Sequence, residues 1–160
     1  MNYNCIQIDD LIMQLENTSE IENIKAIMDK ELDIELRKTK FPYVMQHGDL
    51  WTSNILYNKN EIVLIDWEKY DSYVFFYDLI GFFGVIFNNS LNYYLMKEYK
   101  YGRFDKELTE LFKLFNLEFN KNNKLDLIYL VIINLAIRRE IDSVNLKLKI
   151  NRIKSVFDNL

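Results

Sequence analysis

The pattern of apolar residues changes near Tyr73, and this change sets the class of fold. Upstream, two short runs of β-branched and aliphatic residues, 54–57 and 62–65, flank the polar segment 58–60, which predicts a β-hairpin. Downstream, apolar residues recur at steps of three or four, which predicts helices. The expected helices span 74–87, 91–99, 108–119, 125–141 and 146–157. We therefore expect an α+β fold, mostly α, in which the hairpin is the only convincing β structure apart from one short strand.

That short strand is expected just before the hairpin, after a further helix. Apolar residues recur with helical spacing over 20–38, and Ser19 and Glu22 have the spacing of a capping box. Pro42 cannot continue a helix, and the run 43–45 favours a strand that leads into a polar loop. The chain should therefore enter this loop from a strand.

The length and composition indicate one folded unit. A chain of 160 residues is typical of one domain, so residues 1–160 are expected to form a single domain whose helical part is 74–160. Hydrophobic residues make up 49% of the chain and aromatic residues 15%, which excludes a disordered or low-complexity chain. Bulky buried layers are expected.

The charge and the cysteine content exclude several functional classes. A formal net charge of −4 offers no positive field for nucleic acid or anionic lipid. One cysteine and one histidine cannot assemble a Cys/His zinc site. The first ten residues have no basic segment or apolar core typical of a targeting sequence, and no apolar run reaches the roughly 18 residues that span a bilayer. We expect a cytoplasmic protein without nucleic-acid or membrane partners.

The segment 47–54, HGDLWTSN, carries the pattern H-x-D-L-x-x-x-N, and the strand after the hairpin turn leads to Asp66. Protein-kinase catalytic loops have this spacing. Phosphoryl transfer requires a base beside the acceptor hydroxyl and oxygen ligands for Mg²⁺. Asp49, Asn54 and Asp66 supply these groups. The structural alternative is that all three are turn or strand-end residues facing solvent.

These motifs resemble those of aminoglycoside phosphotransferases and choline kinase-like small-molecule kinases. HGDLWTSNIL, which begins at His47, is similar to the catalytic loop of that family, and LIDWEKY, residues 64–70, is similar to its metal loop. FYDLI, residues 76–80, resembles the start of a helix in the same family. The resemblance implies a kinase-like C-terminal lobe with its catalytic loop at 47–54 and its metal loop at 65–68.

The resemblance also assigns roles to single residues. It implies that Asp49 is the catalytic base and that Asn54 and Asp66 bind Mg²⁺ and, through it, the nucleotide. His47 would orient the loop, and Asp78 would brace it through its backbone. The implied cofactors are Mg²⁺ and ATP or GTP. A bracing role for Asp78 can also be argued from the sequence directly, because Asp78 is the lone acid of its predicted helix. A charge buried there needs hydrogen-bond partners, and the alternative is that Asp78 lies at a solvent-facing edge of the helix.

Two parts of the family pattern are not found. A glycine-rich loop over the nucleotide phosphates and a strand lysine paired with a helix glutamate belong to an N-terminal β lobe. Residues 1–40 contain no glycine and read as helical or polar sequence. We therefore expect the N-terminal β lobe to be absent from this sequence and to be supplied by another chain, or an exposed apolar face to be covered by a second copy.

Three functions remain open. The first is a catalytic lobe that transfers the γ-phosphate of a nucleotide, with Mg²⁺, to a hydroxyl of a small molecule of the aminoglycoside, choline, ethanolamine or sugar type. The second is an inactive kinase-like remnant that serves as a binding or interaction module. The third is a structural helical domain with a chance motif.

The acceptor is also open. Aromatic residues beside the motifs are candidates for a cage around a quaternary ammonium group, and acids further along are candidates for contacts with a cationic aminoglycoside. The aromatic candidates are Trp51, Trp67, Tyr70 and Tyr73, and the acidic ones are Glu140 and Asp142. Both sets have a simpler interpretation, as core aromatics and solvated acids.

Overall fold

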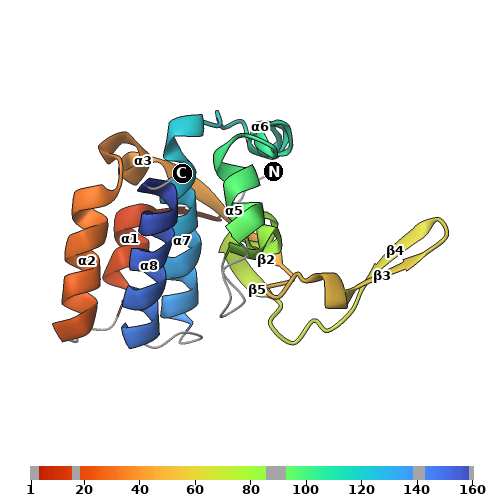
Figure 1. Cartoon of the computed structure of the whole chain (residues 1–160), viewed down its shortest axis with the longest axis horizontal. Helices are drawn as coiled ribbons and strands as arrows, with labels where there is room; N and C mark the ends of the chain where they lie inside the picture. The colour runs from red at the N-terminus through yellow and green to blue at the C-terminus, as the bar shows by residue number, and fades with distance from the viewer. Residues whose placement is uncertain (1–3, 16–18, 86–92, 139–142, 159–160) are drawn as a thin grey trace.

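The computed structural model describes residues 4–15, 19–85, 93–138 and 143–158. Within them the chain is mostly helical with two small antiparallel sheets, an α+β fold (Figure 1). In chain order the elements are β1 (Asn4–Gln7), α1 (Ile8–Met13), α2 (Ser19–Glu31), α3 (Ile34–Lys38), β2 (Lys40–Gln46), β3 (Ile55–Asn58), β4 (Glu61–Leu64), β5 (Asp71–Val74), α4 (Tyr77–Ile80), α5 (Tyr93–Lys100), α6 (Asp105–Leu114), α7 (Lys124–Ile137) and α8 (Ser143–Asp158). Short helical turns lie at Thr52–Asn54, Gly81–Val85 and Lys121–Asn123.

The first sheet has three strands in the order β1-β2-β5, with β2 in the centre. The predicted strand at 43–45 is confirmed as part of β2. Tyr43 lies opposite Asn4 of β1 on one side and Val74 of β5 on the other. The expectation that the hairpin would be the only other β structure is wrong, because four-residue strands such as β1 and β5 are defined by their pairing with β2 rather than by a long alternating pattern.

The second sheet is the predicted hairpin, which is confirmed. Ile55 pairs with Leu64 and Asn58 with Glu61, so the turn is formed by Lys59 and Asn60. Lys59 has a φ of 43°, a left-handed conformation that suits a tight hairpin turn. The hairpin projects away from the helices (Figure 1), and it follows directly on the loop 47–54.

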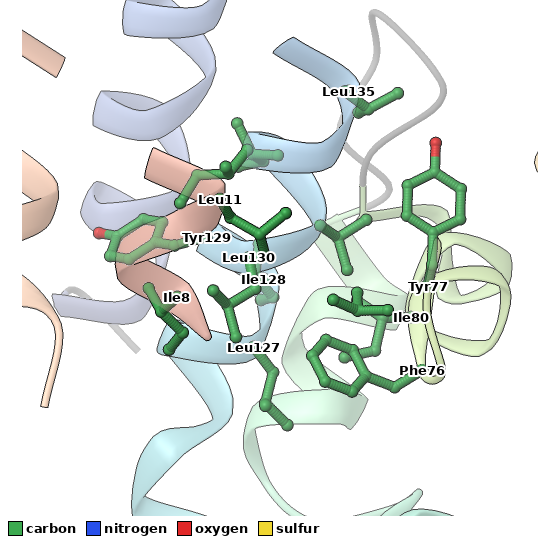
Figure 2. Close-up of a cluster of buried hydrophobic side chains, with 14 of the residues drawn as sticks. Ile8, Leu11, Phe76, Tyr77, Ile80, Leu127, Ile128, Tyr129, Leu130 and Leu135 are labelled. Atoms are coloured by element: carbon green, nitrogen blue, oxygen red, sulfur yellow. The ribbon is translucent and has the colours of Figure 1, made fainter. Parts of the chain in front are cut away.

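Helix α7 is the centre of the core. Residues 127–135 are all at most 3% exposed, and the helix contacts α1, α4, α8 and β5. Figure 2 shows side chains of α1 on one side of α7 and Phe76, Tyr77 and Ile80 on the other. The buried Asn134 is satisfied: its Nδ2 donates to the Leu130 carbonyl at 2.8 Å, and its Oδ1 accepts from the Tyr43 hydroxyl at 2.9 Å. None of the helices in the described part of the chain has the length and apolar character needed to cross a bilayer.

Two predicted helices differ from the observed ones. The helix expected over 20–38 is interrupted, because the Asp33 carboxylate accepts hydrogen bonds from the backbone N–H groups of Glu35 and Leu36 and so begins a new helix, α3. The helix expected from Val74 begins at Tyr77 instead, because Val74 pairs with β2 as the end of β5. A short apolar run is compatible with either a strand or a helix, and at Val74 the pairing with β2 determines that it is a strand.

The remaining helices follow the predicted spacing with shifted ends. Helices α5, α6, α7 and α8 correspond to the four expected after residue 90. The predicted ends at 86–87, 91–92 and 139–141 lie outside the described residues. Helix α7 packs against α1 and α8, and α8 packs against α2 (Figure 1), so the helical bundle combines helices from before and after the hairpin rather than from the downstream part alone.

Candidate active site

The loop 47–54 connects the two sheets, because it leaves β2 at Gln46 and enters β3 at Ile55. Its second residue, Gly48, has a φ of 83°. A Cβ atom at this position would lie 2.2 Å from the Lys69 carbonyl oxygen, so only glycine fits the close approach of the two backbones. The loop is therefore held against the segment that follows the predicted metal loop.

His47 links this loop to the segment before Asp66. The ring is buried at 2% exposure, and its Nδ1 accepts from the Asp49 backbone N–H at 3.3 Å. Its Nε2 lies 2.8 Å from the Ile65 carbonyl oxygen. Since a backbone N–H only donates and a carbonyl only accepts, these partners assign Nδ1 as the acceptor and Nε2 as the donor. His47 thus orients both predicted catalytic segments through their backbones.

Asn54 fixes the other end of the loop. Its side-chain Nδ2 donates to the Asp49 backbone carbonyl oxygen at 2.9 Å, and the backbone carbonyl oxygen of Asn54 accepts from the Ile65 N–H at 3.0 Å. The side chain is 8% exposed, and its Oδ1 has only a long 3.4 Å contact with the Ser53 hydroxyl. The amide is therefore oriented with its oxygen available as an acceptor or a ligand.

Asp66 lies directly after the segment that His47 and Asn54 hold. Its φ of 62° is in the left-handed region, which is uncommon for a residue other than glycine. The residue is exposed, and the next ring, Trp67, anchors the turn by donating from Nε1 to the Leu64 carbonyl at 2.9 Å. Such backbone outliers concentrate at functional sites.

Asp78 accepts two hydrogen bonds from the start of the loop. Its carboxylate receives the His47 N–H at 2.7 Å and the Gly48 N–H at 3.0 Å. Burial raises the pKa of this carboxyl group, although the two N–H bonds act in the opposite direction. The first turn of α4 and the loop are thus joined through the loop backbone, a contact of the kind that the resemblance implies for Asp78.

The donor set fits Mg²⁺. The metal prefers oxygen ligands and is commonly held by one or two carboxylates together with substrate phosphates and water. Asn54 offers an amide oxygen and Asp66 a carboxylate. The described residues contain no cluster of three or more His, Cys, Asp or Glu side chains arranged for a metal.

Two further residues position the loops and carry no sequence motif. The side chain of Gln46 donates to the Val74 carbonyl and accepts from the Asp78 N–H at 3.0 Å. The Tyr73 hydroxyl donates to the Lys69 carbonyl at 2.8 Å, beside Gly48. No spacing marks Gln46, and the sequence indicates Tyr73 only as a candidate for the acceptor cage, so the fold alone reveals these positioning contacts.

Arg138, at the end of α7, reaches the same region from the core. Its guanidinium group donates to the Asp71 carboxylate and to the Ser72 carbonyl, both at 2.5 Å, and lies 4.1 Å from the centre of the Tyr73 ring. The hydrogen bond from Arg138 lowers the pKa of the Asp71 carboxyl group. The strand after the metal loop is therefore tied to the central helix.

The aromatic candidates for an acceptor cage separate into two groups. Trp67 and Tyr70 are about half exposed, and their rings meet edge to face with centroids 5.7 Å apart. Tyr73 is 1% exposed and stacks on Tyr77, so it belongs to the core. Trp51 is half-buried. The acidic candidates, Glu140 and Asp142, lie outside the described residues.

The loop that carries Asp49 and Asn54 at kinase spacing is joined by the buried His47 to Ile65, the residue before Asp66, an arrangement compatible with the phosphotransferase motif that the sequence predicts. The comparison with known families agrees. Residues 10–111 match the phosphotransferase enzyme family, and this range holds the whole loop region from β2 to α4. The chain belongs to this family, which confirms the resemblance to aminoglycoside phosphotransferases and choline kinase-like enzymes. No curated protein and no solved structure matches the chain.

Proposed function

We propose that this chain is the catalytic lobe of a small-molecule kinase, which transfers the γ-phosphate of ATP or GTP to a hydroxyl group. The family membership supports phosphotransfer in general. The single observation that carries the finer proposal is the hydrogen-bonded unit formed by His47, Asp49, Asn54 and Ile65, because it orients the residues on both sides of one site. A chance motif on a structural domain would not require these contacts.

Asp49 is the proposed catalytic base. Its backbone is held on both sides, by the His47 ring at its N–H and by the Asn54 amide at its carbonyl. Among the described residues, no side chain or N–H group donates to its carboxylate, which is therefore available to accept the proton of an acceptor hydroxyl. A base held in this way contributes to transfer mainly by position.

Asn54 and Asp66 are the proposed Mg²⁺ ligands. The amide orientation of Asn54 supports this, because its Nδ2 is engaged and its Oδ1 is free of close contacts. When bound, Mg²⁺ would neutralise charge on the nucleotide phosphates. Asp78 and Gln46 would hold the loop that carries these groups without touching the substrate.

The β-hairpin is the proposed contact surface for a complementary lobe. Tyr57 is 74% exposed, Ile62 68% and Leu56 49%, and an isolated two-stranded hairpin is marginally stable in water. A nucleotide-binding β lobe from outside residues 1–160 would cover these side chains and supply the phosphate contacts. A second copy of the chain is the alternative occupant.

The test is phosphate transfer from radiolabelled Mg·ATP or Mg·GTP to a panel of an aminoglycoside, choline, ethanolamine and simple sugars, with the chain alone and with a candidate β lobe. We expect transfer that Asp49→Asn reduces by at least about 100-fold, the usual scale of general-base catalysis. Asp10→Asn, at an exposed position on α1, is the matched control and should retain full transfer. If no acceptor is labelled under any of these conditions, the enzyme proposal is wrong.

The second candidate function is an inactive binding module, which the exposed hairpin favours. It predicts that Mg²⁺ or nucleotide binds without turnover. Isothermal titration calorimetry with Mg·ATP distinguishes the two, because binding that Asp66→Asn abolishes, in a chain that labels no acceptor, supports the module. Absence of both binding and transfer would leave only the structural interpretation of the motif.

A further inference from the structure

A pocket of about 320 Å³ lies at the end of β2 opposite the loop 47–54. Phe41, near the start of β2, lines it, and His47 follows the other end of the strand six residues later. Six residues of extended chain span roughly 20 Å. The pocket therefore belongs to a different part of the molecule from the candidate active site. Its wall includes the acids Asp33, Glu35 and Glu118 and the apolar side chains Phe41, Phe112, Phe119 and Leu127.

The floor of the pocket is apolar and rigid. Phe41 and Leu127 are 1% exposed and Phe112 is 3% exposed, so these side chains are fixed in the core. The ring of Phe119 lies 5.4 Å from that of Phe112 and extends the aromatic surface outward. The volume is within the range of small-molecule sites, which are mostly apolar with a few polar groups.

The polar part of the wall is acidic. Asp33, Glu35 and Glu118 line the pocket, and no lysine, arginine or histidine within the described part of the chain does. Most of the basic residues adjacent in sequence to the wall have acidic partners elsewhere: Lys121 and Lys124 pair with Asp105 on α6, and Arg37 pairs with Asp9 and Asp29. Lys40 and Lys113 are also adjacent to wall residues but do not line the pocket. Only Glu35 has a cationic partner among the described residues, Lys38 at 3.0 Å, and that pair is exposed.

A buried carboxyl group, Asp126, follows the pocket wall along α7 and senses the negative charge of Asp33, one of the wall residues. Asp126 is adjacent to Leu127 on α7 and is 8% exposed, and no described residue donates a hydrogen bond to it. Burial, and to a lesser degree the negative charge of Asp33, raise its pKa from 3.8 to about 7. Its negative charge, after burial and the charge of Glu31, also contributes to the raised pKa of Tyr129 on the same helix, which is about 12. No cation of the described chain relieves this charge.

We propose that this pocket binds a small organic cation with an apolar body, such as a protonated amine attached to an aromatic or branched alkyl group. The apolar body would lie on Phe41, Phe112 and Phe119, and the cationic group would lie between Asp33 and Glu118. Acidic and aromatic side chains together favour such a ligand over an anion or a neutral apolar one. The site is separate from the proposed phosphotransfer site, and its occupancy does not depend on catalysis.

The probe is 2-phenylethylammonium chloride, compared with its neutral analogue 2-phenylethanol, titrated into the ¹⁵N- and ¹³C-labelled chain and followed by NMR. We expect shifts confined to the pocket residues and at least about 5-fold tighter binding of the cation, the scale of one charge interaction near a surface. The cation should also lower the pKa of Asp126, measured from its side-chain carboxyl ¹³C shift. Equal binding of the two probes, or no saturable binding of the cation, would overturn the proposal.

Two substitutions, at Asp33 and at Glu118, remove the negative charge of the side chain but keep its shape. Asp33→Asn keeps an oxygen that can cap α3, and Glu118→Gln changes an exposed side chain. Each should weaken 2-phenylethylammonium binding about 2- to 5-fold. The matched control is Glu107→Gln, an exposed acid on α6 outside the pocket wall, which should leave binding unchanged. If Glu107→Gln weakens binding as much, the effect is one of net charge and the pocket is not the site.

A third substitution separates this proposal from the proposed function. Asp49→Asn should leave cation binding unchanged, because Asp49 lies at the opposite end of β2 from the pocket. If Asp49→Asn weakens binding and Glu118→Gln does not, the cation binds at the candidate active site and the pocket proposal is wrong. A chain without phosphotransfer activity that still binds the cation in the pocket would contradict the proposed function alone.

Discussion

Apolar side chains are buried in the helical body of this chain and largely exposed in its hairpin region. In α7, residues 127–135 are at most 3% exposed, and even the polar Asn134 has partners for its amide groups. In the hairpin, Tyr57 and Ile62 are more than two-thirds exposed, and the loops beside it hold backbone conformations with positive φ at Gly48 and Asp66. The comparison indicates that stability is concentrated in the body, while the hairpin region carries the groups proposed for phosphotransfer and for contact with a partner lobe.

The largest expected effect is a cavity in the body. Leu130→Ala, at a fully buried position on α7, should lower the free energy of unfolding by about 2–5 kcal/mol. Leu148→Ala on α8, where the side chain is 62% exposed, should change it by less than about 0.5 kcal/mol. Urea denaturation measures both. Similar losses at the two positions would mean that α7 is not the centre of the core.

The second prediction concerns the buried charge in the body. Because the pKa of Asp126 is raised to about 7, the folded state holds its proton more tightly than the unfolded state. This contribution to stability is fully present below about pH 4 and is lost as the pH rises through 7, by up to about 4 kcal/mol at about 1.4 kcal/mol per pKa unit. Asp126→Asn should therefore be more stable than wild type at pH 8 and should lack this pH dependence. Urea denaturation from pH 4 to 8 would contradict this if both proteins showed the same profile.

The third prediction compares two glycines with positive φ, one in each region. Gly48→Ala places a Cβ 2.2 Å from a backbone oxygen, so we expect a loss of about 2–3 kcal/mol and a displaced loop. Gly102→Ala has similar backbone strain, but its Cβ meets the movable side chain of Asp105 at 2.8 Å, so about 1 kcal/mol is expected. Thermal denaturation ranks the two. An equal cost would show that the close approach of Gly48 to Lys69 does not hold the loop.

The smallest expected effect on stability is at the hairpin. Ile62→Ser removes an exposed apolar side chain, so the free energy of unfolding should change by less than about 0.5 kcal/mol. If the hairpin is a contact surface, the same change should reduce association with a β lobe or with a second copy, measured by analytical ultracentrifugation. A large loss of stability would indicate that the hairpin packs within the chain.

The sequence predicts those parts of the structure in which a pattern is long or a motif is chemically specific. The hairpin, the buried helix at 125–137 and the strand at 43–45 follow from periodicity and turn residues. The candidate site residues follow from spacing, and the structure joins His47, Asp49, Asn54 and Asp78 by direct hydrogen bonds. Their chemical roles remain predictions.

The features that could not be predicted depend on contacts between distant parts of the chain. The four-residue strand β1 exists because β2 pairs with it, and the break before α3 exists because the Asp33 side chain caps a new helix. Gln46 and Arg138 reach the site from a strand and from the end of α7, and no local pattern marks them. Where local propensity is weak or ambiguous, contacts between distant parts of the chain determine the secondary structure.

The central claim is that the loops before and after the hairpin form one metal-assisted phosphotransfer site. Titration of Mn²⁺, as a paramagnetic substitute for Mg²⁺, into the ¹⁵N-labelled chain tests it most directly, because it requires neither a partner lobe nor an acceptor. We predict selective broadening of the Asn54 side-chain amide and the Asp66 backbone amide, lost in Asp66→Asn and retained in Asp10→Asn. Broadening confined to other acidic surfaces, with the Asn54 and Asp66 signals unchanged, would contradict the account.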